Sequence, residues 1–508
     1  MNISTDAFLP VVDRFGTSRR VSLGAALSAA GNFGAIHHPS PLVTVACYRL
    51  LLAVLQRVFG ADVAEHGASW WVAGRFPPEP LNAYFEEWGA HFDLFDARRP
   101  FLQVVDLPPE LSRRPWTALA AEKSSGNNKT LFDHALDADP EPLPAADAAL
   151  YLLAAQAMAL GGGRSAFQYT AHAPAATAVL ALITGENLFQ TLLLNLLPQS
   201  RAEHERDVTT WERGGALTVE HMQGGPTVGY RGPAQLYSLP ARSIRLFPDA
   251  VGVMVNHVGL ASGERLKDAE GKDPMVSYRM DAERGPVPMQ LHYERAFWRD
   301  LHALRPRSAT AHQTSGHTPP AVLRAAATLL SRVRSGLKPR LTVFGQCTDK
   351  AKVELWRCES VPLSQALLND SDAWDTIRSV LALAEDQAKV LHDACYRLAF
   401  EQKRGALEPD PKAVRALVQT FPMLPMYWAI LGAAFNDWVS NLGDEDSDAA
   451  RQQWRKEVAY ALRDAWRLAD RVVPATYRGD RSLYEAEKGI RRALVALTPQ
   501  DPSMEDVT

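Results

Sequence analysis

Cysteine is scarce in this chain of 508 residues, which contains only four. Cys47, Cys347, Cys358 and Cys395 are widely separated, and no two of them form a C-x-x-C pair. This spacing encodes neither a disulfide framework nor a structural zinc site and is typical of a reducing compartment. The N-terminus also lacks a basic segment followed by an apolar one, so we expect no secretory signal peptide and a cytoplasmic protein.

Long uninterrupted apolar runs are missing as well. The two most apolar stretches, residues 42–59 and 175–197, are both interrupted by polar or charged side chains, including Arg49 in the first and Glu186 in the second. Neither stretch could cross a bilayer without burying such groups in hydrocarbon. We therefore expect two core helices and no membrane partner.

A large excess of charge of either sign is absent too. The 54 lysines and arginines are balanced by 58 acidic residues, and the formal net charge is −4. This balance excludes a wholly basic nucleic-acid binder, but it is compatible with a local basic groove. The chain is 46% hydrophobic, which is enough for a large core, and its length suggests two or three domains.

The pattern of apolar residues and prolines changes near residue 362. Before it, helical and extended patterns alternate without a regular βαβ rhythm, and proline is frequent. We expect helices at 41–59, 80–90, 145–159, 175–197 and 319–334, and extended segments at 251–259, 341–347 and 352–358. The fold class is therefore α+β, with a large mixed domain at 1–362 and an all-α domain at 363–508.

Four helical segments are expected after residue 362. Apolar residues at a 3–4 step follow Asp370. Further helices open at Asp410, at Ser447 and at Asp480, and prolines interrupt the second near Pro422. Four antiparallel helices with short polar connections predict a four-helix bundle.

One pair of residues raises the possibility of catalysis. Asp133 and His134, in LFDHALD, resemble the His–Asp pair of metal phosphohydrolases. Such enzymes need further ligands on neighbouring helices, because one pair cannot fill the coordination sphere of a metal. The other histidines do not form such a set by spacing. A metal-dependent phosphohydrolase or nuclease remains the alternative function.

Three segments could contact a phosphate or a base. Gly161, Gly162 and Gly163 follow a helix without Walker spacing or lysine, and permit close approach of another backbone or of a ligand. Residues 123–130 form a short-chained polar loop with two lysines. Residues 341–357 are typical of a β-hairpin with a cationic tip, which could be a solvated turn or a probe inserted into a nucleic acid.

Taken together, these features resemble the CasA family, the large subunit of type I-E CRISPR Cascade surveillance complexes. DAFLPV at residues 6–11 looks like the family's N-terminal signature, and FDARRPFLQ at 95–103 is similar to its HPF-[ML]-Q segment. NNKTLFDH at 127–134 resembles its guide-contacting loop. The three glycines, the hairpin and the terminal bundle stand in matching order over nearly the whole chain.

The resemblance implies a non-catalytic subunit that reads a protospacer-adjacent motif (PAM) in double-stranded DNA and helps to open the duplex, while guide RNA supplies sequence specificity. It implies other Cascade subunits as partners and no cofactor. Some members of the family carry four cysteines that look like a zinc site, but the matching regions here lack them, so no metal is carried over. Among the PAM-binding positions that the resemblance implies, Gly161, Gly162 and Gly163 match the family's glycine loop, and Thr348, Asp349, Lys350 and Ala351 match its wedge tip by their flanking residues. The family's lysine finger is best matched by Lys272, with Lys267 and Arg279 near it. This hairpin tip differs from the family's Asn-Gln-Ala tip, so the PAM preference does not carry over.

Two more surfaces are assigned to nucleic acid. We expect Asn127, Asn128 and Lys129 to contact the 5′ end of the guide RNA, because short donors suit splayed bases and phosphates. In the third bundle helix, the cations Lys456, Arg463, Arg467 and Arg471 fall within about 80° at roughly 100° per residue. They could be a solvated face, or a track that holds the displaced DNA strand for a recruited helicase-nuclease.

Overall fold

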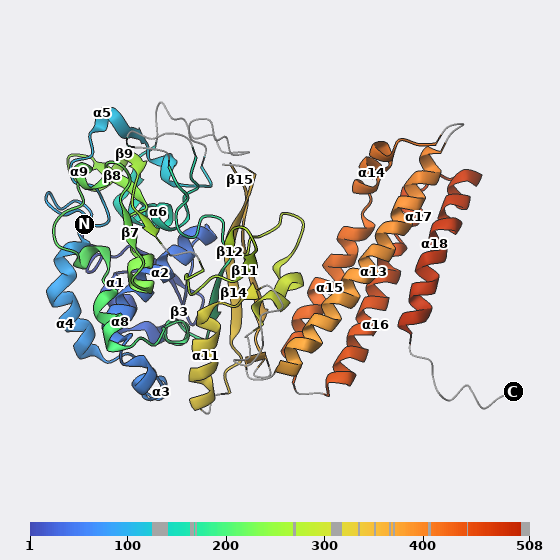
Figure 1. The fold of residues 1–508 in the computed structure, drawn as a ribbon, viewed down its shortest axis with the longest axis horizontal. Helices are drawn as coiled ribbons and strands as arrows, with labels where there is room; N and C mark the ends of the chain where they lie inside the picture. The colour runs from blue at the N-terminus through green and yellow to red at the C-terminus, as the bar shows by residue number, and fades with distance from the viewer. Residues whose placement is uncertain are drawn as a thin grey trace. The chain divides into compact units, whose positions relative to one another are not determined.

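The computed structural model describes residues 1–123, 141–162, 167, 170–267, 271–305, 317–333, 336–349, 352–364, 367–368, 371–404, 408–443 and 446–498 (Figure 1). The chain divides into two compact units, Met1–Phe297 with Ala303–Val361 and Trp298–His302 with Pro362–Thr508. The first is a mixture of helices and strands, and the second is helical, which confirms the predicted α+β class.

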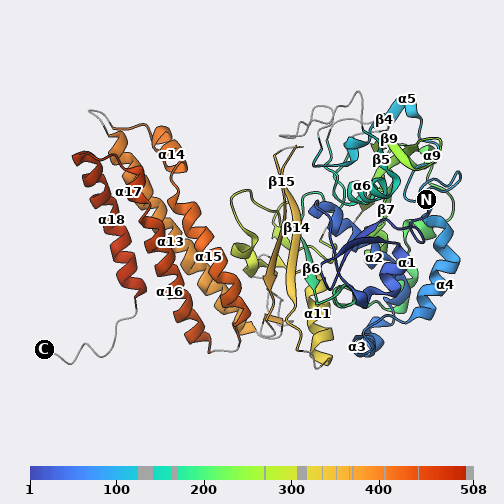
Figure 2. The same cartoon turned by 180° about the vertical axis from the view of Figure 1, so that it is seen from behind.

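A buried helix organises the first unit. Helix α2 (Pro41–Phe59) was predicted from its apolar run. It packs against α6 (Ala145–Met158), which is labelled near it in Figure 2, and against α10 (Pro233–Tyr237). By length and composition α2 could span a membrane, but 89% of its apolar window is buried inside the protein. Apolar burial on every side is the property of a core helix.

Small sheets surround this helix instead of one continuous sheet. Antiparallel β14 (Arg340–Asp349) lies between β15 (Lys352–Pro362) and β6 (Leu180–Thr184). A second sheet pairs β9 (Met254–Ser262) with β4, β5 and β8. The remaining strands are β1 (Leu9–Asp13), β2 (Ser18–Val21), β3 (Phe33–Ile36), β4 (Arg113–Pro115), β5 (Leu143–Pro144), β7 (Thr227–Gly229), β8 (Arg242–Pro248), β10 (Arg265–Lys267), β11 (Tyr278–Asp281), β12 (Gly285–Pro288) and β13 (His317–Thr318).

The helices of the first unit are mostly short. Apart from α2, α6 and α10 they include α1 (Leu23–Ser28), α3 (Val63–Ala73), α4 (Pro78–Trp88), α5 (Pro109–Ser112), α7 (Leu188–Leu194), α8 (Arg201–Arg206), α9 (Val219–Met222) and α11 (Ala321–Arg332). Short 3₁₀ turns lie at Ala30–Asn32, Gly89–Phe92, Trp116–Leu119, Thr210–Glu212 and Phe297–Leu304. Many short elements leave long connections, as the frequent prolines predicted.

The helix predicted at 175–197 is wrong. The segment contains strand β6, then a turn at Gly185, then helix α7, whose start is capped by the Asn187 side chain accepting from the Gln190 N–H at 2.9 Å. A strand buried on both faces has a continuous apolar run and cannot be told from a buried helix by periodicity. Pairing with β14 decides the outcome.

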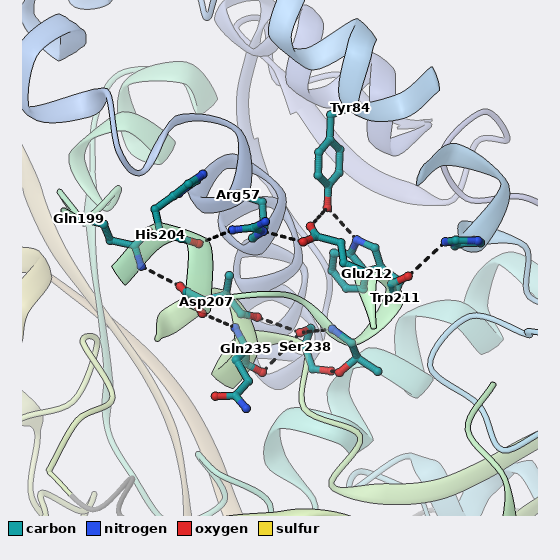
Figure 3. A network of polar contacts seen from close by, with 12 residues as sticks. Arg57, Tyr84, Gln199, His204, Asp207, Trp211, Glu212, Gln235 and Ser238 are labelled. Carbon is teal, nitrogen blue, oxygen red and sulfur yellow. Dashed lines mark hydrogen bonds and ion pairs between the residues drawn. The ribbon is translucent and has the colours of Figure 1, made fainter. Parts of the chain in front are cut away.

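A buried polar network joins several of these short elements (Figure 3). Arg57 on α2 pairs with Glu212 at 2.6 Å, and Glu212 accepts a hydrogen bond from the Tyr84 hydroxyl of α4, also at 2.6 Å. Asp207, with no exposed surface, accepts from the backbone N–H groups of Ala234 (3.0 Å) and Gln235 (2.8 Å). Carboxylates thus satisfy donors of segments that lack regular partners.

The second unit contains four long helices, together with the shorter α14 and α17. Their bounds are α13 (Ser371–Lys403), α14 (Pro411–Gln419), α15 (Met423–Ser440), α16 (Ser447–Trp466), α17 (Ala469–Val472) and α18 (Tyr477–Leu497). The helix pair α14–α15 bends by 41° at the predicted proline break. The last helix begins at Tyr477 with Thr476 as its cap, before the predicted Asp480, because the Thr476 hydroxyl accepts from the Gly479 N–H at 3.2 Å.

Aromatic side chains fill the core of this unit. Trp454 is fully buried and donates its indole N–H to the Val380 carbonyl at 2.9 Å. Trp298, from a segment that the sequence pattern assigned to the first domain, has its ring 4.8 Å from the ring of Phe435. The contacts of the Trp298 ring with Phe435 and Trp454 explain why Trp298–His302, from before Pro362, belong to this unit.

Candidate nucleic-acid interface

The glycine segment follows the end of α6. The Gly161 N–H donates to His172 Nδ1 at 3.0 Å, and a side chain at Gly161 would place its Cβ 2.4 Å from the backbone carbon of Ala171. Packing within the protein therefore accounts for the glycine at 161. Gly162 is exposed with φ +148°, a backbone conformation that favours glycine. Gly163 lies outside the described residues.

The β-hairpin is confirmed as a pair of long strands. β14 pairs with β6 as far as Phe344 opposite Leu180, and the stretch from Gly345 to Asp349 extends past that pairing beside β15. This stretch spans about 17 Å at the usual strand rise. Thr348 is half-buried near the end of β14, whereas Lys350 and Ala351 lie outside the described residues.

The part of the hairpin that extends past β6 is hydrogen-bonded to the end of α6, just before the glycine segment. Gln346 is buried, and its amide N–H₂ donates to the carbonyl oxygens of Met158 (2.9 Å) and Ala176 (2.7 Å). Met158 is the last residue of α6, three positions before Gly161. The hairpin and the glycine segment are therefore positioned by the same buried side chain.

A buried arginine supports the same region. Arg242 is 4% exposed and donates to the carbonyl oxygens of Ala159 (2.9 Å) and Ala241 (2.8 Å). Burial lowers the pKa of its guanidinium to about 10, so it remains cationic at neutral pH. Sequence reasoning missed Arg242 and Gln346. Gln346 follows the apolar residues Val343 and Phe344, whereas Arg242 is followed by Ser243 and Arg245, and neither local pattern identifies a partner.

One cavity of about 280 Å³ brings three predicted segments together. Its lining includes Gly162, Lys123 at the start of the predicted guide-contacting loop, and Val353 on β15. Arg242 and Glu122 line it as well. Burial raises the pKa of the Glu122 carboxyl above its usual range.

Lys272 lies elsewhere, beside a second cavity of about 440 Å³. It is exposed, and its Nζ is 5.2 Å from the centre of the Tyr230 ring. The next residue, Asp273, is buried and accepts a hydrogen bond from Arg49 Nη1 at 2.8 Å. Because Asp273 anchors the turn, the lysine is presented to solvent from a fixed backbone.

The cations of the third bundle helix face outward. Lys456, Arg463, Arg467 and Arg471 are all exposed, while Val458, Ala461, Leu462, Ala465 and Ala469 on the other side are buried. Helix α16 ends at Trp466, so Arg467 is its C-cap residue and Arg471 belongs to α17. Arg467 also pairs with Asp464 at 3.3 Å. The part of this stripe that keeps the spacing of one helix therefore runs from Lys456 to Arg467.

Eight predicted residues cannot be placed. Besides Gly163, Lys350 and Ala351, these are Asn127, Asn128, Lys129, Asp133 and His134, which also lie outside the described residues. Over the part of the chain that the structure describes, no group of three or more His, Cys, Asp or Glu side chains could hold a metal ion.

Comparison with known proteins gives one family. The sequence model of the CRISPR-associated protein Cse1 family matches residues 2–465. CasA/Cse1 from Thermus thermophilus is 34% identical over 505 residues, which cover 97% of both chains. A crystal structure of Thermus thermophilus CasA superposes with a TM-score of 0.85 at 31% identity, over 98% of this chain and 99% of that one.

More distant structures share the fold. Thermobifida fusca Cse1 is 23% identical, with a TM-score of 0.82 over 98% of this chain and 99% of that one. A chain of a CRISPR RNA-guided surveillance complex is 22% identical, with a TM-score of 0.74 over 97% and 99%. The match over most of the sequence, and the agreement of the whole fold, show that this chain belongs to the CRISPR-associated Cse1/CasA family.

Proposed function

We propose that this chain is the non-catalytic large subunit of an RNA-guided surveillance complex, in which it recognises a PAM in double-stranded DNA and helps to open the duplex. Family membership supports the role. The observation that carries the proposal is the meeting of Gly162, Lys123 and Val353 around one cavity, because these residues come from three segments far apart in the sequence.

The PAM would be read through backbone and cations. An exposed glycine with positive φ allows the chain to lie against the minor groove, where a side chain would collide with DNA. Lys272 supplies a cation from an anchored turn, and the hairpin ending at Thr348 and Asp349, with Lys350 and Ala351 beyond it, supplies a wedge. The hydrogen-bond donors and acceptors in the minor groove distinguish the base pairs only partly, so we expect the subunit to tolerate several PAM sequences.

Guide RNA and other Cascade subunits would hold the chain in the complex. Asn127, Asn128 and Lys129 follow closely after Lys123, which borders the cavity with Gly162. Replacing these three residues with alanine should release the subunit from the guide-bearing assembly, as measured by co-purification. Undiminished co-purification would place the guide contact elsewhere.

The bundle would hold the displaced strand for a recruited helicase-nuclease. Cationic surfaces follow a single-stranded backbone without reading its sequence. Reversing Lys456, Arg463 and Arg467 to glutamate should leave PAM recognition intact, shorten the lifetime of the opened state and impair DNA degradation. A triple variant that retains the open strand as long as the parent would reduce this stripe to a solvated surface.

Gly162→Asp tests PAM recognition directly. It should abolish binding of PAM-containing DNA by the assembled complex, because a carboxylate would meet phosphates, while the chain still folds and its unfolding temperature falls no further than that of a control variant at another glycine of positive φ. Gly215→Asp is the matched control, since Gly215 is also exposed, has φ +82°, and would have no atom within 4 Å of an added Cβ. Equal DNA binding by Gly162→Asp and the control would refute the assignment.

The alternative enzyme has its own test. Purified chain mixed with DNA and Mg²⁺ or Mn²⁺ should show no hydrolysis if the proposal is right. Hydrolysis that disappears in His134→Ala would instead favour a metal-dependent phosphohydrolase that uses Asp133 and His134.

A further inference from the structure

An exposed tyrosine lies within the cationic stripe of the bundle. Tyr460 on α16 is 53% exposed and is among the large apolar side chains left open to solvent. Among the described residues it has no hydrogen bond from its side chain and no ring contact. An aromatic ring of this size normally buries most of its surface, so its exposure beside several cations is a feature that a ligand could use.

The helix places this ring among the cations. At roughly 100° per residue, and taking Lys456 as zero, Arg463 lies at about −20°, Arg467 at about +20° and Tyr460 at about +40°. At about 1.5 Å of rise per residue, Tyr460 is about 6 Å from Lys456 and about 4.5 Å from Arg463 along the axis. Lys456 and Arg463 therefore lie within about one helical turn of the ring on its two sides. Glu457 and Asp464 lie beyond the ring at about +100° and +80°, and Asp464 pairs with Arg467 at 3.3 Å.

Two other tyrosines of the bundle, Tyr427 and Tyr484, have partners. The Tyr427 hydroxyl is buried and donates to the Ala384 carbonyl at 2.8 Å. Tyr484 on α18 is 58% exposed, much like Tyr460, but its ring faces Lys488 Nζ at 4.8 Å. Within the described part of the chain, Tyr460 thus differs from a tyrosine of equal exposure in having an unoccupied ring face beside several cations.

Single-stranded nucleic acid suits such a surface. Its backbone is bound by cations at short intervals, and its unpaired bases stack on aromatic side chains whatever their sequence. An acidic protein partner would have to place an aromatic or arginine side chain opposite the ring, whereas every nucleotide of an unpaired strand carries a base next to its phosphate. The alternation of cation, aromatic and cation along one helix therefore favours an unpaired strand.

We propose that Tyr460 is a base-stacking residue, which holds one unpaired base of the displaced DNA strand while Lys456 and Arg463 contact the flanking phosphates. This inference rests on the proposed displaced-strand track and adds to it a contact that does not depend on charge. It converts a purely electrostatic surface into one that fixes the position of a base.

The test uses the complete guide-loaded complex with target DNA that carries 2-aminopurine at successive positions of the displaced strand. In the parent, one position should show quenched fluorescence, because stacking on a ring quenches this base analogue. Tyr460→Ala should remove that quenching and shorten the lifetime of the captured strand about tenfold, as expected for the loss of one base–aromatic stack. Tyr460→Trp should preserve both signals, and Tyr484→Ala should change neither.

Salt dependence separates stacking from charge. Tyr460→Ala should weaken capture at every salt concentration and leave the salt slope unchanged, whereas Lys456→Ala should reduce that slope by about one phosphate contact. If Lys456→Ala acts as stated and Tyr460→Ala changes nothing, the stacking role is wrong and the track stands. If neither variant has an effect, the track itself fails, and the stacking role with it.

Discussion

The two units of this protein position their exposed groups in different ways. In the first unit, Gly162 and the hairpin depend on contacts between residues far apart in the sequence, such as Gln346 with Met158. In the helical unit, Lys456, Arg463 and Tyr460 are placed by the period of a single helix. The side chains that share one face of a helix can be predicted from the sequence, whereas those brought together by long-range contacts cannot.

The units also differ in how they are stabilised. The first contains buried ionic and polar networks that join short elements, as around Asp207 and Glu212 (Figure 3). The second is filled by aromatic rings, with Trp298, Phe435 and Trp454 in contact. We therefore expect the first unit to respond to changes of hydrogen bonding and pH, and the second to changes of volume.

The largest effect is expected from Trp454→Ala. Removing a fully buried indole leaves a cavity and should cost about 3–5 kcal/mol of unfolding free energy. The loss should be confined to the helical unit, so chemical denaturation followed by circular dichroism should show its transition at lower denaturant. An equal shift in the transition of the mixed unit would contradict the separation of the two cores.

The same comparison predicts a cost of similar size for Asp207→Ala. The change leaves the N–H groups of Ala234 and Gln235 buried without an acceptor, at about 1–3 kcal/mol for each orphaned group. The transition of the mixed unit should move, with little effect on the helical one. Tyr230→Leu, at a half-buried site outside this network, is the control and should cost less.

Gln346→Leu should affect function as well as stability. It removes both hydrogen bonds that fasten the hairpin and should cost about 1–3 kcal/mol. Because the hairpin is then less firmly held, duplex opening beside the PAM, measured with a fluorescent base analogue, should slow more than initial DNA binding weakens. Lys350→Glu, at the predicted tip, should slow opening without the loss of stability. Normal opening by Gln346→Leu would show that the anchor has no functional role.

The smallest effect is expected from acidification. Burial lowers the pKa of His38 and of His204 below the ordinary value, and His38 Nδ1 accepts the Ser40 N–H at 3.0 Å, which requires that this nitrogen carry no proton. The unfolded chain binds these protons more readily, so this stability is present above the ordinary histidine pKa of about 6.5 and is lost as the pH falls through the lower folded values. As the pH falls from about 7 to about 5, the thermal unfolding temperature of the mixed unit should therefore fall. The histidines of the helical unit, His302 and His392, are exposed, and its transition should change less.

Much of the helical unit was predictable because its signals are local. The opening of α14 after Asp410 depends on that side chain accepting from the Lys412 N–H at 3.0 Å, and the outward direction of Lys456 and Arg463 depends on helical period alone. The hairpin strands were predictable for a similar reason, since alternation of side chains marks them. In the candidate interface, the glycine segment and hairpin could be named, but not their meeting at one cavity.

The structural features that the sequence left undecided depend on contacts with distant segments of the chain. The composition and periodicities determined an α+β protein with a helical C-terminal part, because caps, prolines and apolar spacing act over a few residues. Only the folded chain decided that β6 is a strand, that Gly161 packs against Ala171, and that Trp298 belongs to the aromatic core. In each case an apolar or small residue is compatible with two local structures. The free energy that selects one of them comes from the surface that the residue buries against residues far along the chain.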